Sequence, residues 1–248
     1  MSETAPEPDV TFNETSIDGM RVLVAEPDGV SPKGTVVMFP HVGGLTKTME
    51  TMAGIVAGGG YRCLVPDLYH RLGRIVLDPE SHDPDAVRIR QIAASTVTNE
   101  TAMADFQSVL TVLKSDPGAS GKVGTIGFGK SGWFAILAAA TFPDEVAAAA
   151  SVLGFGFSLQ PEGEALDTFG RISCETYFAF AENDEIIPPD EPERVKALLA
   201  RSPSKSLLVV HSGARHPYVF PDRAVHDPAA AARDWSAIFD MYGRALGV

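Results

Sequence analysis

The stretch Lys122-Val-Gly-Thr-Ile-Gly-Phe-Gly-Lys-Ser-Gly-Trp-Phe134 determines how this chain must fold. Its first residues are apolar and β-branched, as in a buried strand, and its last residues open a segment rich in Ala, Leu and Ile that predicts a helix over 131–142. The glycines in between predict a tight turn. The free N–H groups of such a turn and the positive end of the helix dipole face whatever lies there, so the stretch predicts a site.

Two sequence patterns overlap in this stretch and predict different functions. The string Gly124-x-x-x-x-Gly129-Lys130-Ser131 matches a phosphate-binding loop, in which the lysine reaches the phosphates and the serine binds magnesium. That pattern needs a strand before its first glycine, whereas residues 124–127 themselves look like the strand. No later strand ends in a convincing magnesium-binding Asp. The second pattern, a nucleophile elbow, fits the predicted strand better.

In a nucleophile elbow the nucleophile follows the strand directly and is flanked by small residues. Aligning Gly127-Phe-Gly-Lys-Ser-Gly132 with this pattern places Gly129 at the nucleophile position, where there is no side chain. Glycine adopts the strained backbone of such a turn at little cost, so we expect the turn to persist. Ser131 would lie two residues too late and is expected to cap the helix, with a displaced nucleophile as the alternative.

Composition limits the classes of protein to which the chain can belong. Its 248 residues fit one large α/β domain or two small ones, and a hydrophobic content of 45% is enough for a substantial core. The formal net charge is −12 and basic residues form no stripe, so we expect no nucleic-acid partner. No apolar run approaches the length that spans a membrane, so we expect no membrane partner either.

The beginning of the chain is acidic and rich in proline, and it lacks the basic and apolar segments of a signal peptide. We therefore expect a loose tail over residues 1–10, a single domain over residues 11–248, and a cytoplasmic location. Cys63 and Cys174 lie in apolar, strand-like runs, and we expect them to be buried free thiols in a reducing compartment.

Apolar strands alternate with helices along the rest of the chain. The predicted strands are 20–26, 35–39, 61–65, 123–127, 147–153, 176–180 and 206–210, and the predicted helices are 46–56, 100–114, 131–142, 191–200 and 228–245. We expect residues 73–94 to form an irregular surface excursion and residues 154–171 a loop at the rim of a pocket. This alternation predicts an α/β fold with a mostly parallel sheet and helices on both faces.

Four loops follow predicted strands and contain residues capable of chemistry. They begin at His41, at Gly129, at Asp184 and in the segment that ends at His216. Parallel sheets carry their sites at the carboxyl ends of the strands, so we expect these loops to form one cleft. An α/β-hydrolase orders its triad as nucleophile, acid and histidine, and Gly129, Asp184 and His216 keep that order.

The chain resembles the dienelactone hydrolase family in four segments. They are Val65-Pro-Asp-Leu-Tyr-His-Arg71, Val123-Gly-Thr-Ile-Gly-Phe128, Glu182-Asn-Asp-Glu-Ile-Ile-Pro188 and Gly213-Ala-Arg-His-Pro-Tyr-Val-Phe-Pro-Asp-Arg223. The resemblance extends from about Met20 onward and implies a single α/β-hydrolase domain. It also implies that Asp184 orients His216 as the general base, and that the backbone N–H groups of Val42 and Lys130 form an oxyanion hole.

The chain departs from the family at the positions that matter most. Family members carry Cys, or sometimes Ser, where this chain has Gly129, and Gly where it has Ser131. They commonly carry a carboxylate where it has His41, which is therefore either a second acid or base or a residue that hydrogen-bonds its own loop. The covalent mechanism of the family cannot be transferred to this chain.

The remaining candidate site residues are ones that could bind the substrate. The Lys130 side chain is either a solvated surface lysine or a pocket cation for an anionic substrate, and Tyr69 and Arg71 are candidates for lining the pocket. We expect no metal and no cofactor, because the histidines show no ligand spacing of a known kind.

Our leading hypothesis is a hydrolase-like enzyme without a covalent nucleophile. His216, held by Asp184, would act on water or on a substrate proton of a small carbonyl compound such as a lactone, enol lactone or diketone. The reaction would be hydrolysis, elimination or isomerisation. The alternatives are a retired hydrolase that only binds a small molecule, and a conventional serine hydrolase that uses Ser131. The sequence does not set the oligomeric state.

Overall fold

The fold is an eight-stranded sheet between two layers of helices, as seen in a computed structural model that describes residues 9–116, 118–119 and 121–247. The strands are β1 (Val10–Ile17), β2 (Met20–Pro27), β3 (Thr35–Phe39), β4 (Arg62–Pro66), β5 (Val123–Phe128), β6 (Val146–Val152), β7 (Glu175–Asn183) and β8 (Ser206–Arg215). The helices are α1 (Lys47–Gly58), α2 (Pro84–Thr96), α3 (Asn99–Ser115), α4 (Lys130–Thr141), α5 (Glu162–Arg171), α6 (Glu191–Leu199) and α7 (Pro228–Leu246), with a 3₁₀ turn η1 (His70–Leu72).

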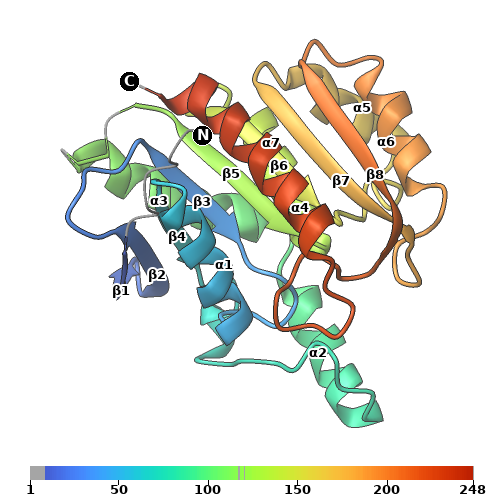
Figure 1. Cartoon of the computed structure of the whole chain (residues 1–248). Coiled ribbons are helices and arrows are strands. Elements are labelled where there is room, and N and C mark those ends of the chain that lie inside the picture. The colour runs from blue at the N-terminus through green and yellow to red at the C-terminus, as the bar shows by residue number, and fades with distance from the viewer. Residues whose placement is uncertain (1–8, 117, 120, 248) are drawn as a thin grey trace.

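The sheet is mostly parallel, which confirms the predicted fold class. Its strand order is β1-β2-β4-β3-β5-β6-β7-β8, and only the pairings of β2 with β1 and with β4 are antiparallel. Helices α1 and α7 cover one face and α3 and α4 cover the other (Figure 1). Every residue of β3 and β5 is buried, which explains why these strands read as continuous apolar runs.

The elbow depends on two glycines that leave no room for a side chain. A Cβ atom on Gly127 would lie 1.9 Å from the carbonyl oxygen of Ser131, and a Cβ atom on Gly132 would lie 2.7 Å from the Cα atom of Gly154. These contacts bring the end of β5 against the first turn of α4. They also bring α4 against the loop that follows β6. The strand-to-helix turn predicted from the sequence is therefore enforced by backbone packing.

The structure differs from the sequence prediction at three elements. Strand β1 was not predicted, because six of its eight residues are exposed and its sequence is polar; it is held by its antiparallel pairing with β2. Helix α2 lies in the segment expected to be irregular, and Ala93 is its only buried residue, so no amphipathic period marks it. The cap of α2 is the local signal that marks this helix. The Asp83 side chain accepts hydrogen bonds from the N–H groups of Asp85 and Ala86, and a proline follows it in the first turn.

Helix α5 occupies part of the segment 154–171 that was expected to be a loop, because two glycines weaken its helical signal. Strand β1 begins at Val10, inside the expected tail of residues 1–10, and residues 1–8 of that tail lie outside the described residues. Cys63 is buried in β4, whereas Cys174 is only half-buried and precedes β7; both are free thiols.

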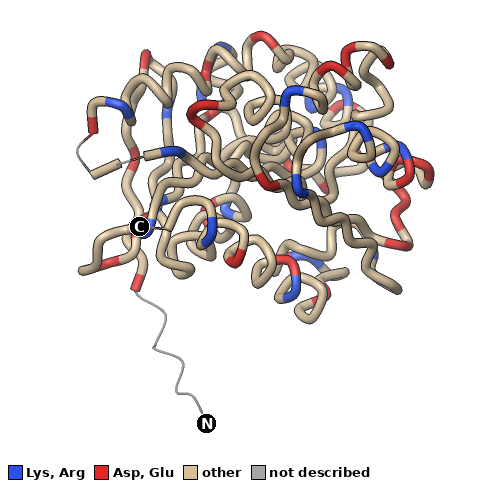
Figure 2. Tube along the Cα trace, turned by 90° about the horizontal axis from the view of Figure 1, so that it is seen from above, with Lys and Arg blue, Asp and Glu red and all other residues tan. Residues whose placement is uncertain are grey.

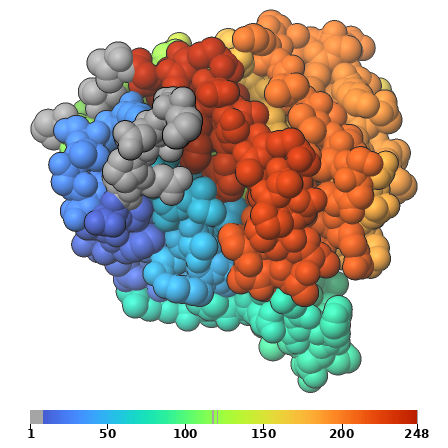
Figure 3. Space-filling view, viewed as in Figure 1, coloured from blue at the N-terminus to red at the C-terminus, as the bar shows by residue number. Residues whose placement is uncertain are grey.

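Charge is distributed over the whole molecule. Figure 2 shows Lys and Arg positions interspersed with Asp and Glu positions along the trace. Helix α2 projects from the body beyond the carboxyl ends of the strands (Figures 1 and 3). Within the described ranges, no helix has both the length and the apolar character needed to cross a membrane.

The close approach at Gly127 gives a stability prediction. We expect Gly127→Ala to lower the free energy of unfolding by about 3 kcal/mol or more, because the added methyl group meets backbone atoms that cannot move aside cheaply. The matched control is Gly170→Ala, which lies in α5 with nothing within 4 Å of its Cβ position. It should leave stability unchanged or raise it by up to about 1 kcal/mol. Urea unfolding of both variants would measure this, and equal effects would contradict the packing argument.

Candidate active site

A cleft of about 450 Å³ opens at the carboxyl ends of the parallel strands, where the sequence predicted a site. Its walls are mainly apolar and include Val42, Phe128, Leu153, Phe155 and Phe220. Gly129 and His216 line the same cleft. The structure thus brings together loops that lie far apart in the sequence.

Asp184 and His216 form a hydrogen-bonded pair across the ends of β7 and β8. The Asp184 Oδ2 atom lies 3.0 Å from His216 Nδ1, and its Oδ1 atom accepts hydrogen bonds of 2.8 Å from the N–H groups of Ile186 and Ile187. Burial disfavours the ionised carboxyl, but the hydrogen bond and charge of His216 and the two N–H groups outweigh it and lower the pKa of Asp184. The ionised carboxylate accepts from Nδ1–H, so Nε2 is the basic nitrogen of His216.

Gly129 is the turn residue between β5 and α4. Its backbone has φ +60° and ψ −131°, a conformation that side chains rarely adopt. Its N–H donates to the Val152 carbonyl at 3.3 Å, and its own carbonyl accepts from the N–H groups of Gly132 and Phe155 at 2.9 and 3.3 Å. A Cβ atom at Gly129 would meet only the Phe155 ring, at an ordinary 3.7 Å. Unlike Gly127 and Gly132, therefore, Gly129 leaves open space that faces the cleft.

Two backbone N–H groups beside this space are available as donors. Lys130 is the first residue of α4, so its N–H has no partner within the helix. Val42 follows β3, and neither N–H donates to another protein group within the part of the chain that is described. Both residues line the cleft. The sequence predicted these two groups as an oxyanion hole, and their geometry makes them candidates for that role.

Tyr69 holds the loop that carries Val42. Its hydroxyl donates to the Val42 carbonyl oxygen at 2.9 Å. Burial, aided by the negative charge of Asp67, raises the pKa of Tyr69 to about 12, so the phenol stays protonated and able to donate. Tyr69 does not line the cleft of Gly129 and His216; it borders a small apolar cavity behind the loop.

His41 uses both ring nitrogens within its own loop. Its Nδ1 accepts from the N–H of Gly43 at 2.8 Å, and its Nε2 lies 3.2 Å from the Thr46 hydroxyl. Burial, and secondarily the positive charge of Arg223, lower the pKa of His41 to about 4. The ring edge packs against Phe220. Of the two roles left open by the sequence, this geometry favours hydrogen bonding of the loop over acid–base chemistry.

Ser131 does not cap α4, so that expectation is wrong. The residue at the N-cap is Gly129, and the Ser131 hydroxyl donates to the Pro40 carbonyl at 2.6 Å. Ser131 is buried and borders the cavity behind the loop rather than the cleft of His216. This position argues against the alternative of a serine hydrolase that uses Ser131. The phosphate-loop interpretation also fails, because Gly124 and the three residues after it lie within β5.

The Lys130 ammonium is a structural cation as well as a lining group. It donates to the carbonyls of Ala94 and Val97 at 2.8 and 3.2 Å, which secures the end of α2 against the elbow. Burial lowers its pKa. Arg71 makes a forked pair with Asp105 of α3, at 2.9 and 2.6 Å, and does not line the cleft.

Several residues that line the cleft were not predicted from the sequence, among them Arg90, Arg223 and Phe155. Arg223 ends one of the quoted segments, and its guanidinium pairs with Glu80 at 3.0 Å, which ties the loop of His216 to the segment before α2. Arg90 lies on α2, a helix that the sequence did not reveal, and donates to the Asp78 carbonyl at 2.8 Å. Only the Asp-Pro cap of α2 signalled that this segment was ordered.

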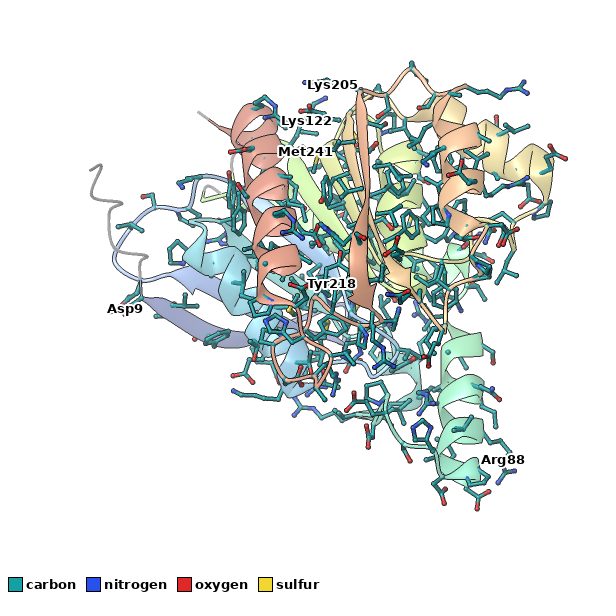
Figure 4. The ribbon with its side chains drawn as sticks, turned by 45° about the vertical axis from the view of Figure 1, so that its right-hand side comes forward. Asp9, Arg88, Lys122, Lys205, Tyr218 and Met241 are labelled. Carbon is teal, nitrogen blue, oxygen red and sulfur yellow. The ribbon has the colours of Figure 1, made fainter. Side chains whose placement is uncertain are left out.

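A buried carboxylate anchors the loop of His216. Asp234 of α7 accepts hydrogen bonds from the hydroxyls of Tyr177 and Tyr218 at 2.7 and 2.5 Å, and lies 2.5 Å from His211 Nε2. Tyr218 is two residues beyond His216, and Figure 4 shows it near the end of β8 and the start of α7. Its pKa is raised, chiefly by burial and by the charge of Asp234, so it remains a donor. The network holds the end of β8 against α7.

No group of three or more His, Cys, Asp or Glu side chains within the described ranges has the arrangement needed to hold a metal ion.

The fold and the acid–histidine pair together define an α/β-hydrolase. The solved structures that it resembles share this fold. A protein from Klebsiella pneumoniae subsp. pneumoniae MGH 78578 assigned as a dienelactone hydrolase superposes with a TM-score of 0.82 at 22% identity, over 95% of this chain and 99% of that one.

A dienelactone hydrolase-like promiscuous phosphotriesterase from metagenomic libraries has a TM-score of 0.74 at 20% identity, over 96% of this chain and 98% of its own. The model of the dienelactone hydrolase family matches residues 20–246, and the chain belongs to that family. It is 26% identical to the carboxymethylenebutenolidase of Rhodococcus opacus, over 86% of this chain and 82% of that protein. It is 27% identical to the carboxymethylenebutenolidase homolog of Rattus norvegicus, over 87% and 82%.

The low pKa of His41 predicts a pH-dependent contribution to stability. In the unfolded chain His41 titrates near 6.5, and in the folded protein near 4. Between these values the unfolded state binds a proton that the folded state does not. The contribution of the neutral His41 to the free energy of unfolding is therefore complete above pH 6.5. It is lost as the pH falls toward 4, and the free energy of unfolding then decreases by on the order of 3 kcal/mol.

His41→Asn is the informative variant, because its amide oxygen can still accept from the Gly43 N–H but does not titrate. We expect the free energy of unfolding of the natural protein to fall more steeply between pH 6.5 and pH 4 than that of the variant. Urea unfolding at a series of pH values measures both. Parallel pH profiles would show that His41 is not held neutral in the folded protein.

Proposed function

We propose that this protein is a dienelactone-hydrolase-like enzyme that works without a covalent nucleophile on a small carbonyl compound, such as a lactone, enol lactone or diketone. The position and surroundings of Gly129 are the main support for this proposal. Gly129 occupies the nucleophile position of an otherwise intact elbow, and its open space lies in the same cleft as His216, which is held by an ionised Asp184. The chain retains a base and donors but has no side chain to attack the substrate.

Water is the natural substitute for the missing side chain. A water molecule above Gly129 would donate a proton to Nε2 of His216 as its oxygen attacks the substrate carbonyl carbon. The negative charge that develops on the carbonyl oxygen would be stabilised by the N–H groups of Val42 and Lys130. Asp184 stabilises the imidazolium, which then returns the proton to the leaving oxygen.

The same groups support a proton-transfer reaction. With a diketone or an enol lactone, His216 would remove a proton next to the carbonyl, and the N–H groups of Val42 and Lys130 would hold the enolate oxygen. Hydrolases that have lost a triad member keep on the order of 10³-fold catalysis over water from such donors and from binding alone. We therefore expect a modest rate constant.

The cleft favours a substrate with an apolar body and a negatively charged group. Its walls are largely apolar, and Arg90 has no carboxylate partner within 4.0 Å among the residues that the structure describes. Arg223 is already neutralised by Glu80. The relative from Rhodococcus opacus is named for a butenolide that bears a carboxyl group, which agrees with this expectation.

The base is tested by His216→Ala. We expect the variant to fold and to lose at least 10²-fold in kcat, because general-base catalysis typically contributes 10²- to 10⁴-fold. The matched control is His70→Ala, which removes a histidine that pairs with Asp105 outside the cleft and should retain turnover. Product formation from small lactones measures the effect. Undiminished turnover in His216→Ala would refute the proposed base, and tight binding of unchanged lactone by the natural protein would indicate a retired hydrolase instead.

The elbow is tested by restoring a nucleophile. Gly129→Cys should place a thiol in the cleft beside His216 and create esterase activity on small activated esters, together with sensitivity to thiol-directed reagents. The added side chain costs on the order of 1–3 kcal/mol of backbone strain, which a domain of this size usually tolerates.

Gly129→Ala is the control for that experiment, because it introduces the same backbone strain without a nucleophile. Hydrolysis of p-nitrophenyl acetate by the natural protein and both variants gives the comparison. If Gly129→Cys is no faster than Gly129→Ala, the side chain at this position does not reach the substrate carbon, and the proposed register of the elbow is wrong.

A further inference from the structure

We propose that a small free thiol can act in place of the missing side chain, so that the protein transfers an acyl group from an ester or lactone to that thiol. The inference rests on the base and the N–H donors of the proposed function, but it assigns a second substrate and a different product. The product is a thioester rather than a carboxylic acid.

The space above Gly129 is open enough to admit a free thiol. A Cβ atom at Gly129 would find only the Phe155 ring nearby, at 3.7 Å, and the position opens directly into a cleft of about 450 Å³. A molecule that is not bonded to the backbone must stay at van der Waals distance from the Gly129 Cα atom. It would therefore enter from the cleft with its sulfur over Gly129 and its carbon chain pointing away, among the apolar walls.

The groups around Gly129 would also activate a thiol bound there. The groups that would make a cysteine reactive at this position are all present without the cysteine. His216 is oriented to accept a proton at Nε2, and α4, a helix of twelve residues, begins at the next residue and favours a negative charge at its N-terminus. Thiols ionise near pH 8.5, far more easily than water, and are strong nucleophiles. Apolar walls such as Phe155 and Leu153 also favour a thiol's carbon chain over water.

The step balances without an oxidant or reductant. The thiol gives its proton to Nε2 of His216, and its sulfur forms a bond to the carbonyl carbon while the N–H groups of Val42 and Lys130 hold the oxyanion. The bond from that carbon to the ester oxygen then breaks, and the imidazolium returns the proton to the leaving oxygen. An ester and a thiol become a thioester and an alcohol; a lactone opens to a thioester that carries the hydroxyl group.

The experiment offers the natural protein a lactone, dihydrocoumarin, with and without 2-mercaptoethanol, and separates thioester from acid by mass spectrometry. We expect thioester to form at least tenfold faster than in the same mixture without protein. We expect His216→Ala to abolish this acceleration and Gly129→Ala to reduce it at least tenfold, since its methyl group projects from the Cα atom toward the sulfur and would clash with it. Circular dichroism verifies that both variants are folded.

The outcomes separate this inference from the proposed function. Acid that forms in a His216-dependent reaction, with thioester at the uncatalysed rate, would overturn the inference and leave the water reaction standing. Thioester that forms without acid would support the inference and contradict water activation. Acceleration that survives in both variants would place the reaction elsewhere on the protein and overturn the inference.

Discussion

The structure depends on the close contact between Gly127 and the first turn of α4. The Cβ position of Gly127 lies 1.9 Å from the carbonyl oxygen of Ser131, so no side chain fits and the helix must start directly against the strand. This contact fixes Gly129 at the tip of the turn, with φ +60°, and the next residue, Lys130, begins α4 and lines the cleft. A backbone constraint therefore builds the turn between β5 and α4, and this constraint does not depend on a side chain at Gly129.

The two histidines that line the cleft, His41 and His216, differ in how many of their ring nitrogens are hydrogen-bonded. His41 has a partner on each ring nitrogen and a pKa lowered to about 4, so it is neutral and occupied. His216 has a carboxylate on Nδ1, while Nε2 has no partner within the described residues. The loop that carries His216 is held by the buried Asp234 of α7, which accepts a hydrogen bond from the hydroxyl of Tyr218. The packing of α7 against the sheet thus supports the position of the loop that carries His216.

The sequence predicted the sheet, the elbow and the pairing of Asp184 with His216, because each rests on a short-range signal: apolar strands, glycine spacing and family-like motifs. It did not predict β1 or α2, which bury few side chains and are held by pairing and capping. It also misplaced Arg71, whose partner Asp105 belongs to a helix more than thirty residues further along the chain. The direction of a long side chain depends on tertiary contacts that local patterns do not contain, and the same limit concealed Arg90.

On the proposed function, the natural protein catalyses its reaction without forming a covalent acyl-enzyme. Intact-protein mass spectrometry of samples quenched in acid during turnover of a small activated ester tests this most directly, with Gly129→Cys as the positive control for trapping. We expect the natural protein to keep its unmodified mass at every time point, because Gly129 has no side chain and the Ser131 hydroxyl donates a hydrogen bond to the Pro40 carbonyl. A transient acyl adduct on the natural protein, at Ser131 or on any other side chain, would contradict it.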